Sequence, residues 1–432
     1  MNSVVESDRR WIYWAVAASL IGLWLFIPPC SLTLGPVTLR HFELVRWLPL
    51  AIGLIACPRA LLRWHWLDVP ILLYCACPFL AGVMNQLDWS TSAWESVKEF
   101  SYWWIPYAIG RFYLDSESSR SAMAVCVVAG ALLYLPPTIY EIFQGPTLAK
   151  WVTGQEFGRM LRGADRGNTF KPSVFLSSGF VLTMFYAWAA LISLHYAVRT
   201  FWVWFMPPMD WDRPIPKTNT WLFQGILSGI LMAVIVVCKS LGSIVLVAIG
   251  GVVVLLNRTR FAGVALATLC LLPPIYIASR TTGIASSDRI DRVVRQFAPE
   301  VRAGSLKYRL DAEDLVFASM KDHVWWGYGN WGQWSEGRPS MVLDGFWLFA
   351  WTRTGMVCVI AFLTMVALPV MIVGVHAARE GWDITRSMGF PCALFLALVL
   401  IDSMFNYFGE APVMMCVGVV TAWARELVRE MG

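Results

Sequence analysis

Apolar stretches of membrane-spanning length recur along the whole chain and are separated by polar segments. A helix needs about 20 apolar residues to cross the core of a bilayer. We therefore predict an all-α membrane protein, a polytopic bundle of about 12 transmembrane helices. The predicted spans are 11–28, 43–58, 67–84, 100–114, 121–142, 174–198, 220–238, 241–256, 261–279, 346–375, 388–408 and 411–426.

The composition agrees with this pattern. Of the 432 residues 57% are hydrophobic and 15% are charged, whereas about a quarter of the residues of a soluble domain are charged. Many of the 24 Trp stand near the ends of the apolar runs, as in the aromatic belts of membrane proteins. The net charge of +5 suits positive cytoplasmic loops and indicates no nucleic-acid partner. The ten cysteines lie almost wholly in apolar runs without metal-ligand spacing, so we expect neither a metal nor a cofactor.

Basic residues in the short loops predict the orientation. With Arg9 and Arg10 inside, both termini are cytoplasmic, and the first apolar run is a retained membrane helix. Two outside loops are nevertheless basic, 143–173 and 280–343. The chain thus divides into helices one to nine with the first basic loop (1–279), the large loop (280–343) and helices ten to twelve (344–432).

The large loop is too long for a simple connection. Its part Tyr308–Asp322 has a mixed amphipathic pattern that predicts a helix lying on the membrane. A glycine-dense aromatic turn follows, from Gly327 to Gly332.

Basic residues of these outside segments are candidates for binding a diphosphate. Guanidinium groups match phosphate in two-point geometry and would stabilise a diphosphate leaving group. Arg162, Arg166 and Arg309 lead, because each stands among glycines or at a predicted helix start, and Lys239 could join them from a tight outside turn. Alternatively, such side chains extend to lipid headgroups without binding a substrate.

Asp344 is the leading acid–base candidate. It precedes an apolar run, so its carboxylate should lie at membrane depth, where ionisable groups are costly and usually functional. The alternative is that Asp344 caps the next helix. Asp402 and Asn406 either line a cavity or join two helices, and His323 is interpreted as structural. Phosphate-binding loops, zinc-protease motifs and hydrolase elbows are absent from the sequence, and the Asp210-x-Asp212 pair lies in a cytoplasmic loop.

Three segments, in order along the chain, contain most of these candidate residues. They are Arg162-Gly-Ala-Asp-Arg166-Gly-Asn-Thr-Phe170-Lys-Pro172; Tyr308-Arg309 followed by Asp322-His323-Val-Trp-Trp-Gly327-Tyr-Gly329-Asn330; and Asp344-Gly-Phe-Trp-Leu348 followed by Thr354-Gly355. Together they resemble the O-antigen ligase and O-antigen polymerase family of bacterial envelope enzymes. Ser173 stands where that family has Asn, Val324 where it has Pro, and Asp344 where ligases have His.

This resemblance implies metal-independent, inverting glycosyl transfer at the periplasmic face of the bacterial inner membrane. The donor would be an undecaprenyl-diphosphate-linked glycan, and the acceptor a glycan or a glycolipid. Arg162, Arg166 and Arg309 would bind the diphosphate, Asp344 would activate the acceptor, and membrane lipids would surround the helices. Ligase and polymerase activity both stay open.

Two other classes of function are considered. A transporter or flippase of lipid-linked glycans should carry charged residues inside its helices along a path across the bilayer. Few such residues occur beyond Arg46 and Asp402, which favours chemistry at the surface. An envelope-assembly protein without catalysis is the third possibility.

Overall fold

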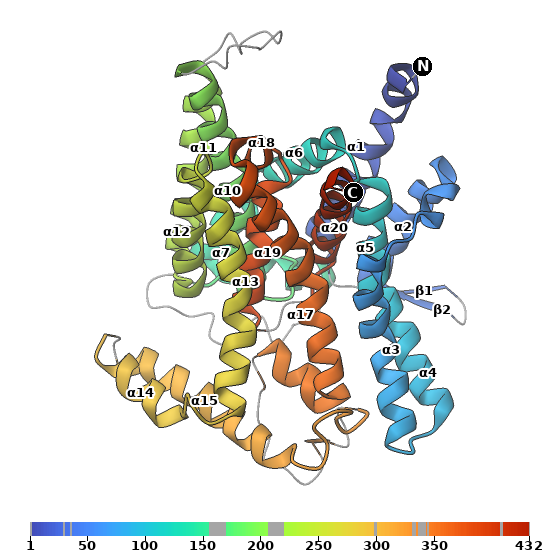
Figure 1. The fold of residues 1–432 in the computed structure, drawn as a ribbon, viewed down its shortest axis with the longest axis vertical. Coiled ribbons are helices and arrows are strands. Elements are labelled where there is room, and N and C mark those ends of the chain that lie inside the picture. The colour runs from blue at the N-terminus through green and yellow to red at the C-terminus, as the bar shows by residue number, and fades with distance from the viewer. Residues whose placement is uncertain are drawn as a thin grey trace.

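The apolar runs of the sequence form long helices in a computed structural model of the chain (Figure 1). The structure describes residues 2–28, 31–34, 37–154, 170–205, 220–297, 300–330, 334–335, 343, 345–406 and 409–431. The described elements are α1 (Asn2–Phe26), β1 (Ser31–Leu34), β2 (Val37–Arg40), α2 (His41–Ala56), η1 (Pro58–Leu62), η2 (Trp66–Asp68), α3 (Val69–Met84), α4 (Trp89–Glu99), η3 (Phe100–Trp104), α5 (Ile105–Tyr113), α6 (Glu117–Leu133), α7 (Leu135–Gln144), α8 (Leu148–Thr153), α10 (Gly179–Phe205), α11 (Thr220–Val237), α12 (Leu241–Leu255), α13 (Arg260–Thr281), α14 (Ser287–Arg295), α15 (Glu300–Ser319), α17 (Phe346–Glu380), α18 (Trp382–Thr385), α19 (Phe390–Asp402) and α20 (Ala411–Met431).

Among these described elements, seven helical segments are long and apolar enough to cross a membrane. They are Trp66–Met84, Glu117–Gln144, Gly179–Val203, Thr220–Val237, Arg260–Thr281, Phe346–Glu380 and Ala411–Glu430. Three further apolar helices are shorter, namely Trp11–Phe26, Leu241–Leu255 and Phe390–Asp402. The protein is therefore a predominantly helical membrane protein, although the predicted number of spans is not established.

The predicted spans 43–58 and 100–114 show why the number differs. The first coincides with α2, which is only 16 residues long and contains Pro49. The second begins in the π-helical turn η3, which joins the largely polar α4 to the short α5. A continuous helical path is present in both places, but neither has 18 apolar helical residues of its own.

A two-stranded antiparallel hairpin, which the sequence analysis did not predict, connects α1 to α2 (Figure 1). In its register Ser31 faces Arg40 and Leu34 faces Val37. The alternation in Leu-Thr-Leu and Val-Thr-Leu is a strand pattern, but each run is too short to stand out between two membrane helices.

The centre of the bundle is α19. Every residue from Phe390 to Leu400 is buried, and the helix packs against α10, α12, α13, α17 and α20. A helix that is apolar on all sides is stable only when other helices surround it. Trp188 of α10 stacks on Phe395 of α19 with ring centroids 4.7 Å apart.

Close helix packing also uses glycine. A Cβ atom at Gly110 of α5 would overlap with the carbonyl oxygen of Met415 in α20, and one at Gly418 would overlap with the carbonyl of Tyr107. Small residues at such positions let two membrane helices approach through their backbones.

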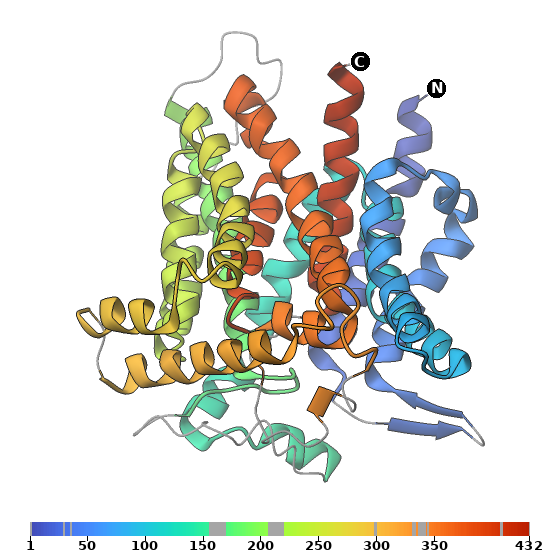
Figure 2. The ribbon, with the colours of Figure 1, turned by 60° about the horizontal axis from the view of Figure 1, so that its bottom comes forward.

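Both chain ends lie at the upper side of Figure 1, whereas α14 and α15 lie at the lower side. Figure 2 shows α14 and α15 running crosswise to the long helices of the bundle. We call the end of the bundle next to these two helices the α15 end. The residues with the most specific chemistry meet there.

Candidate functional site

The site is built on the turn that follows α19 at the α15 end. Its carboxylate, Asp402, is 5% exposed and accepts a hydrogen bond at Oδ1 from Asn406 Nδ2 at 3.0 Å. The other oxygen, Oδ2, is buried and has no hydrogen-bond partner among the described residues. A buried carboxyl group is either protonated or stabilised by positive charge nearby.

Positive charge acts on Asp402 from two other segments. Arg309 of α15 and Lys171, which precedes α10, both lie within electrostatic range of its carboxylate. Lys171 also acts on the thiol of Cys238, the residue before Lys239. The segments that carry Lys171 and Arg309, which are far apart in the sequence, therefore lie close to the same carboxyl group.

The turn between α11 and α12 forms another wall of the site. Lys239 lies in this turn with a positive φ of 54°. Gly242, three residues later, is so close to the site that a Cβ atom there would lie 3.9 Å from Asp402 Oδ1. We call Lys171, Lys239 and Arg309 the cationic cluster. Each of the three also makes other contacts within the protein.

Lys171 is positioned by a buried acid that the sequence analysis did not single out. Glu141 of α7 is fully buried, and its Oε2 accepts the backbone N–H groups of Ser173 at 2.9 Å and Val174 at 2.7 Å. Its Oε1 accepts the N–H of Leu148 at 3.1 Å. One carboxylate therefore replaces three missing backbone partners and fixes the segment that enters α10.

Arg309 is positioned by an ion-pair network at the start of the large loop. Arg280, at the end of α13, places Nε 2.6 Å from Glu313 Oε2 and Nη2 2.9 Å from Asp314 Oδ1. Tyr276 donates its hydroxyl to Glu313 at 2.8 Å. Glu313 lies one helical turn after Arg309, so the network fixes this part of α15. Burial raises the pKa of Glu313, and the hydrogen bonds from Arg280 and Tyr276 act in the opposite direction.

The same helix bears on one prediction. The segment Tyr308–Asp322 was predicted to form an amphipathic helix lying on the membrane. The first part of this segment belongs to α15, which runs crosswise to the long helices (Figure 2). Leu310 and Val316 are buried at 1% and 0% exposure, and Phe317 packs against Trp347 and Trp351 of α17, so these apolar side chains contact protein.

The chain enters α17 directly beside Asp402. The N–H of Phe346 donates to the carbonyl oxygen of Ser403 at 2.9 Å. A Cβ atom at Gly345 would lie 2.5 Å from the carbonyl oxygen of Met404. The third sequence motif therefore begins against the turn that carries the site's carboxylate.

The predicted site residues have different outcomes. Arg309 and Lys239 are described, and both belong to segments that meet at Asp402. Asp344, Arg162 and Arg166 lie outside the described residues, so their roles stay predictions. Lys171 and Glu141 were not among the candidates. Lys171 could have been found from the Lys-Pro sequence that precedes an apolar run. Nothing in the local sequence distinguishes Glu141 from the other acidic residues.

Gly327 of the second motif and Gly355 of the third lie where two backbone segments pack directly against each other. Gly355 interrupts α17 with a φ of 84°, and a Cβ atom there would overlap with the carbonyl oxygen of Trp325. Next to this interruption, the N–H of Met356 donates to the carbonyl oxygen of Val324 at 2.9 Å. The N–H of Tyr328 donates to the carbonyl oxygen of Thr352 at 3.0 Å. Both glycine signals are therefore explained by the docking of one backbone segment on another.

His323 belongs to the same structural unit. Its ring stacks on Tyr328 with centroids 4.1 Å apart, and its carbonyl oxygen accepts the N–H of Gly327 at 2.8 Å. These contacts favour the structural interpretation of His323 over a catalytic one.

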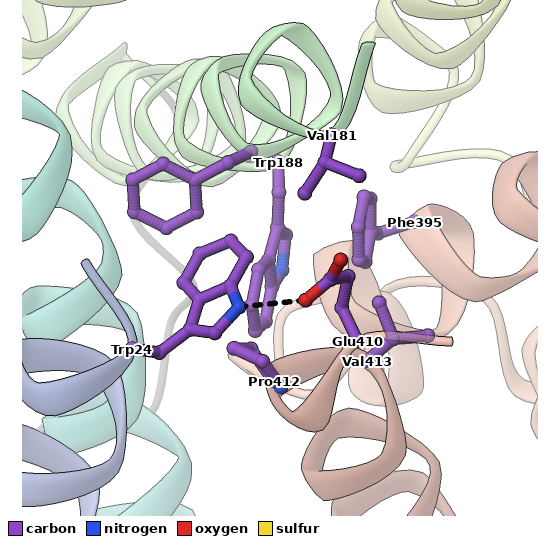
Figure 3. A pocket seen from close by; sticks show the side chains of 8 residues that line it. Trp24, Val181, Trp188, Phe395, Glu410, Pro412 and Val413 are labelled. Carbon is purple, nitrogen blue, oxygen red and sulfur yellow. Dashed lines mark hydrogen bonds between the residues drawn. The ribbon is translucent and has the colours of Figure 1, made fainter. Parts of the chain in front are cut away.

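An apolar pocket lies near the Lys171 segment, between α1, α10, α19 and α20 (Figure 3). Its empty volume, including the space open to solvent, is about 230 Å³, and it is lined by Trp24, Val181, Phe185, Trp188, Phe395, Glu410, Pro412 and Val413. Glu410 contributes a carboxylate, which accepts hydrogen bonds from Trp24 Nε1 at 2.8 Å and Ser177 Oγ at 2.5 Å. Ser177 connects this pocket to the segment that holds Lys171.

Metal-binding groups were sought over the part of the chain that the structure describes. No set of three or more His, Cys, Asp or Glu side chains there is arranged to hold a metal ion. The described site brings two cations within electrostatic range of a buried carboxyl group, and such cations suit an anionic substrate group.

Comparison with known proteins adds no family to this picture. No family model matches the chain, and no curated protein matches it in sequence.

Proposed function

We propose that this protein transfers a glycan from an undecaprenyl-diphosphate-linked donor to a glycan or glycolipid acceptor. The reaction takes place at the outer face of the bacterial inner membrane, with both chain termini in the cytoplasm. The observation that supports this most directly is that Arg309 and Lys171 lie within electrostatic range of the buried Asp402, beside the turn that carries Lys239, at one end of the bundle. The described residues Lys171, Arg309 and Phe346, which belong to the three segments of the sequence resemblance, lie near the turn that carries Asp402.

The cationic cluster suits a diphosphate at membrane depth. Lys171, Lys239 and Arg309 come from separate segments, so a ligand between them would be contacted from several sides. Cations that are fixed before the reaction stabilise charge as it develops, because no reorganisation is needed during the step. The polyprenyl chain of the donor is apolar and fits beside the helices of the bundle.

The proposed step is an inverting displacement. An acceptor hydroxyl oxygen forms a bond to the anomeric carbon of the donor sugar, and the bond from that carbon to the diphosphate oxygen breaks. The electron pair leaves with the diphosphate, whose added negative charge the cationic cluster stabilises. The hydroxyl proton passes to a carboxylate. Asp344 is the base that the family resemblance suggests. The carboxylate of Asp402 keeps the side chains of the cationic cluster in position.

The decisive experiment uses purified full-length protein in lipid nanodiscs with a polyprenyl-diphosphate glycan and a glycan or glycolipid acceptor. Arg309→Ala should abolish transfer, because it removes one of the groups that stabilise the leaving diphosphate. The matched control is Lys307→Ala on the same helix, whose cation is already paired with Asp288 and Asp311 at 3.0 Å each. This control should transfer at the wild-type rate.

Undiminished transfer by Arg309→Ala would refute the assignment. Movement of the donor across the bilayer without a new glycosidic bond would indicate a flippase instead. Product length separates the two branches of the proposal, because a ladder of repeats identifies a polymerase and a single addition identifies a ligase.

A further inference from the structure

The helix α14 has an apolar side that α15 covers only in part: Ile290 and Val294 are half-buried, whereas Val293 and Phe297 stay exposed among the described residues. Its apolar residues Ile290, Val293 and Val294, together with Phe297 just beyond its end, are spaced by three and four positions and share one side. Val293 is 56% exposed and Phe297 is 84% exposed. Exposing such side chains to water is unfavourable, so this face is expected to have a partner.

The opposite side of α14 is strongly charged. Asp291 pairs with Arg295 at 2.9 Å, and Asp288 pairs with Lys307 of α15 at 3.0 Å. Arg289 and Arg292 donate to backbone carbonyl oxygens, and neither forms an ion pair with a carboxylate of the described residues. The helix therefore combines an apolar face with an excess of positive charge.

The position of α14 indicates what covers its apolar face. It follows α13, which is one of the helices long and apolar enough to cross a membrane. Figures 1 and 2 show α14 running crosswise to α13 and extending sideways from the bundle. A helix that leaves a membrane span crosswise lies close to the plane of the bilayer surface. The exposed Ile284 in the connection between the two helices extends the apolar surface.

We infer that α14 lies in the outer headgroup layer of the membrane, with Val293 and Phe297 among the lipid chains and Arg289 and Arg292 against anionic headgroups. Amphipathic helices with arginine on the polar side and bulky apolar residues on the other bind this layer and insert their apolar side by about 5–10 Å. Each basic residue near an anionic surface adds attraction, which depends on the charge of the lipids.

This location has a consequence for the rest of the large loop. The helix α14 packs against α15, which carries Arg309, and the exposed ion pair between Lys307 and Asp288 adds little to this contact. A membrane-bound α14 therefore holds α15 at the level of the headgroups. This inference takes the orientation of the chain from the proposed function, but it concerns lipid contact and does not depend on glycan transfer.

Spin labels test the inference on the full-length protein in nanodiscs of zwitterionic lipid with one quarter phosphatidylglycerol. The labelled variants are Val293→Cys and Phe297→Cys, and the matched control is Arg292→Cys on the charged side of the same helix. We expect the first two labels to be accessible to oxygen at a depth of about 5–10 Å below the phosphates. Their accessibility to an aqueous nickel complex should be several-fold lower than that of the control.

The background for labelling removes Cys30, Cys57 and Cys126 by substitution with Ser, because the other seven cysteines are buried. Equal access of the nickel complex to all three labels would overturn the inference. So would labels that neither reagent reaches, because these would mean that protein covers this face. A depth that is unchanged in purely zwitterionic nanodiscs would contradict the role of anionic headgroups.

Discussion

Removing the guanidinium of Arg280 tests how α15 is held in place. Arg280 and Glu313 have side chains that are 1% and 2% exposed, so they form a buried ion pair. The variant Arg280→Met fills similar volume but leaves a buried carboxylate with Tyr276 as its remaining partner. Removing one partner of a buried pair costs about 3–5 kcal/mol. The exposed pair of Arg280 with Asp314 adds little, because Asp314 is 46% exposed.

Hydrogen exchange with mass spectrometry measures this cost as local opening of α15. A loss of about 3 kcal/mol raises amide exchange in peptides from 303–319 roughly a hundredfold, because 1.4 kcal/mol corresponds to a factor of ten. The control Arg295→Ala removes an exposed ion pair and should cost less than about 1 kcal/mol. Exchange of α15 that is the same in Arg280→Met as in the wild type would refute the proposed anchoring.

The same variant should depend on pH with a definite sign. Burial already raises the pKa of Glu313, and loss of Arg280 removes an interaction that lowers it. A carboxyl group with a raised pKa in the folded state is destabilising when it must be charged. The folded state therefore loses stability as pH rises from the unfolded pKa, near 4.3, through the higher folded pKa. The exchange difference, corrected for intrinsic rates, should be larger at pH 8 than at pH 5.5. The double variant with Glu313→Leu should show no such dependence.

Three further predictions concern the site and its support. Gly355→Ala places a Cβ atom at a positive φ and against the carbonyl oxygen of Trp325, so it should lower the free energy of unfolding by about 3 kcal/mol and reduce the yield of folded protein. The control Gly229→Ala in α11, where nothing lies within 4 Å of the added Cβ atom, should leave the yield unchanged. Glu141→Ala leaves buried backbone N–H groups without an acceptor, so exchange of residues 170–178 should rise and glycan transfer should fall; unchanged exchange there would contradict the proposed support. Asp402→Asn keeps the side-chain shape but removes the carboxylate within range of the cations, and it should lower kcat for transfer by about tenfold or more with little effect on donor KM. An equal loss in kcat for a remote buried variant of similar stability would indicate a structural role.

Much of the helical architecture could be predicted from the sequence, because membrane spans need long apolar runs that are visible locally. The count of spans could not. Length and composition alone do not decide whether α2, with Pro49, or the short α5 crosses a membrane. The β1–β2 hairpin was missed for a similar reason, since two runs of four residues carry little periodic signal.

The candidate site was predictable only in part. Arg309 and Lys239 were chosen because basic residues on an outer surface suit phosphate, and the fold brings their segments to Asp402. The roles of Lys171 and Glu141 depend on contacts between residues about 30 positions apart, which have no local signature. The glycines at 327 and 355 stood out in sequence for a structural reason, namely the interlock of two backbone segments.

Direct measurement of diphosphate binding tests the central claim. Native mass spectrometry of the full-length protein, titrated with undecaprenyl diphosphate and undecaprenyl monophosphate, reports affinity without requiring an acceptor or turnover. Wild-type protein should prefer the diphosphate, and Arg309→Ala should weaken diphosphate binding about tenfold or more, while Lys307→Ala should bind as the wild type does. Equal affinity of wild type and Arg309→Ala for the diphosphate, or no preference for it over the monophosphate, would contradict the account.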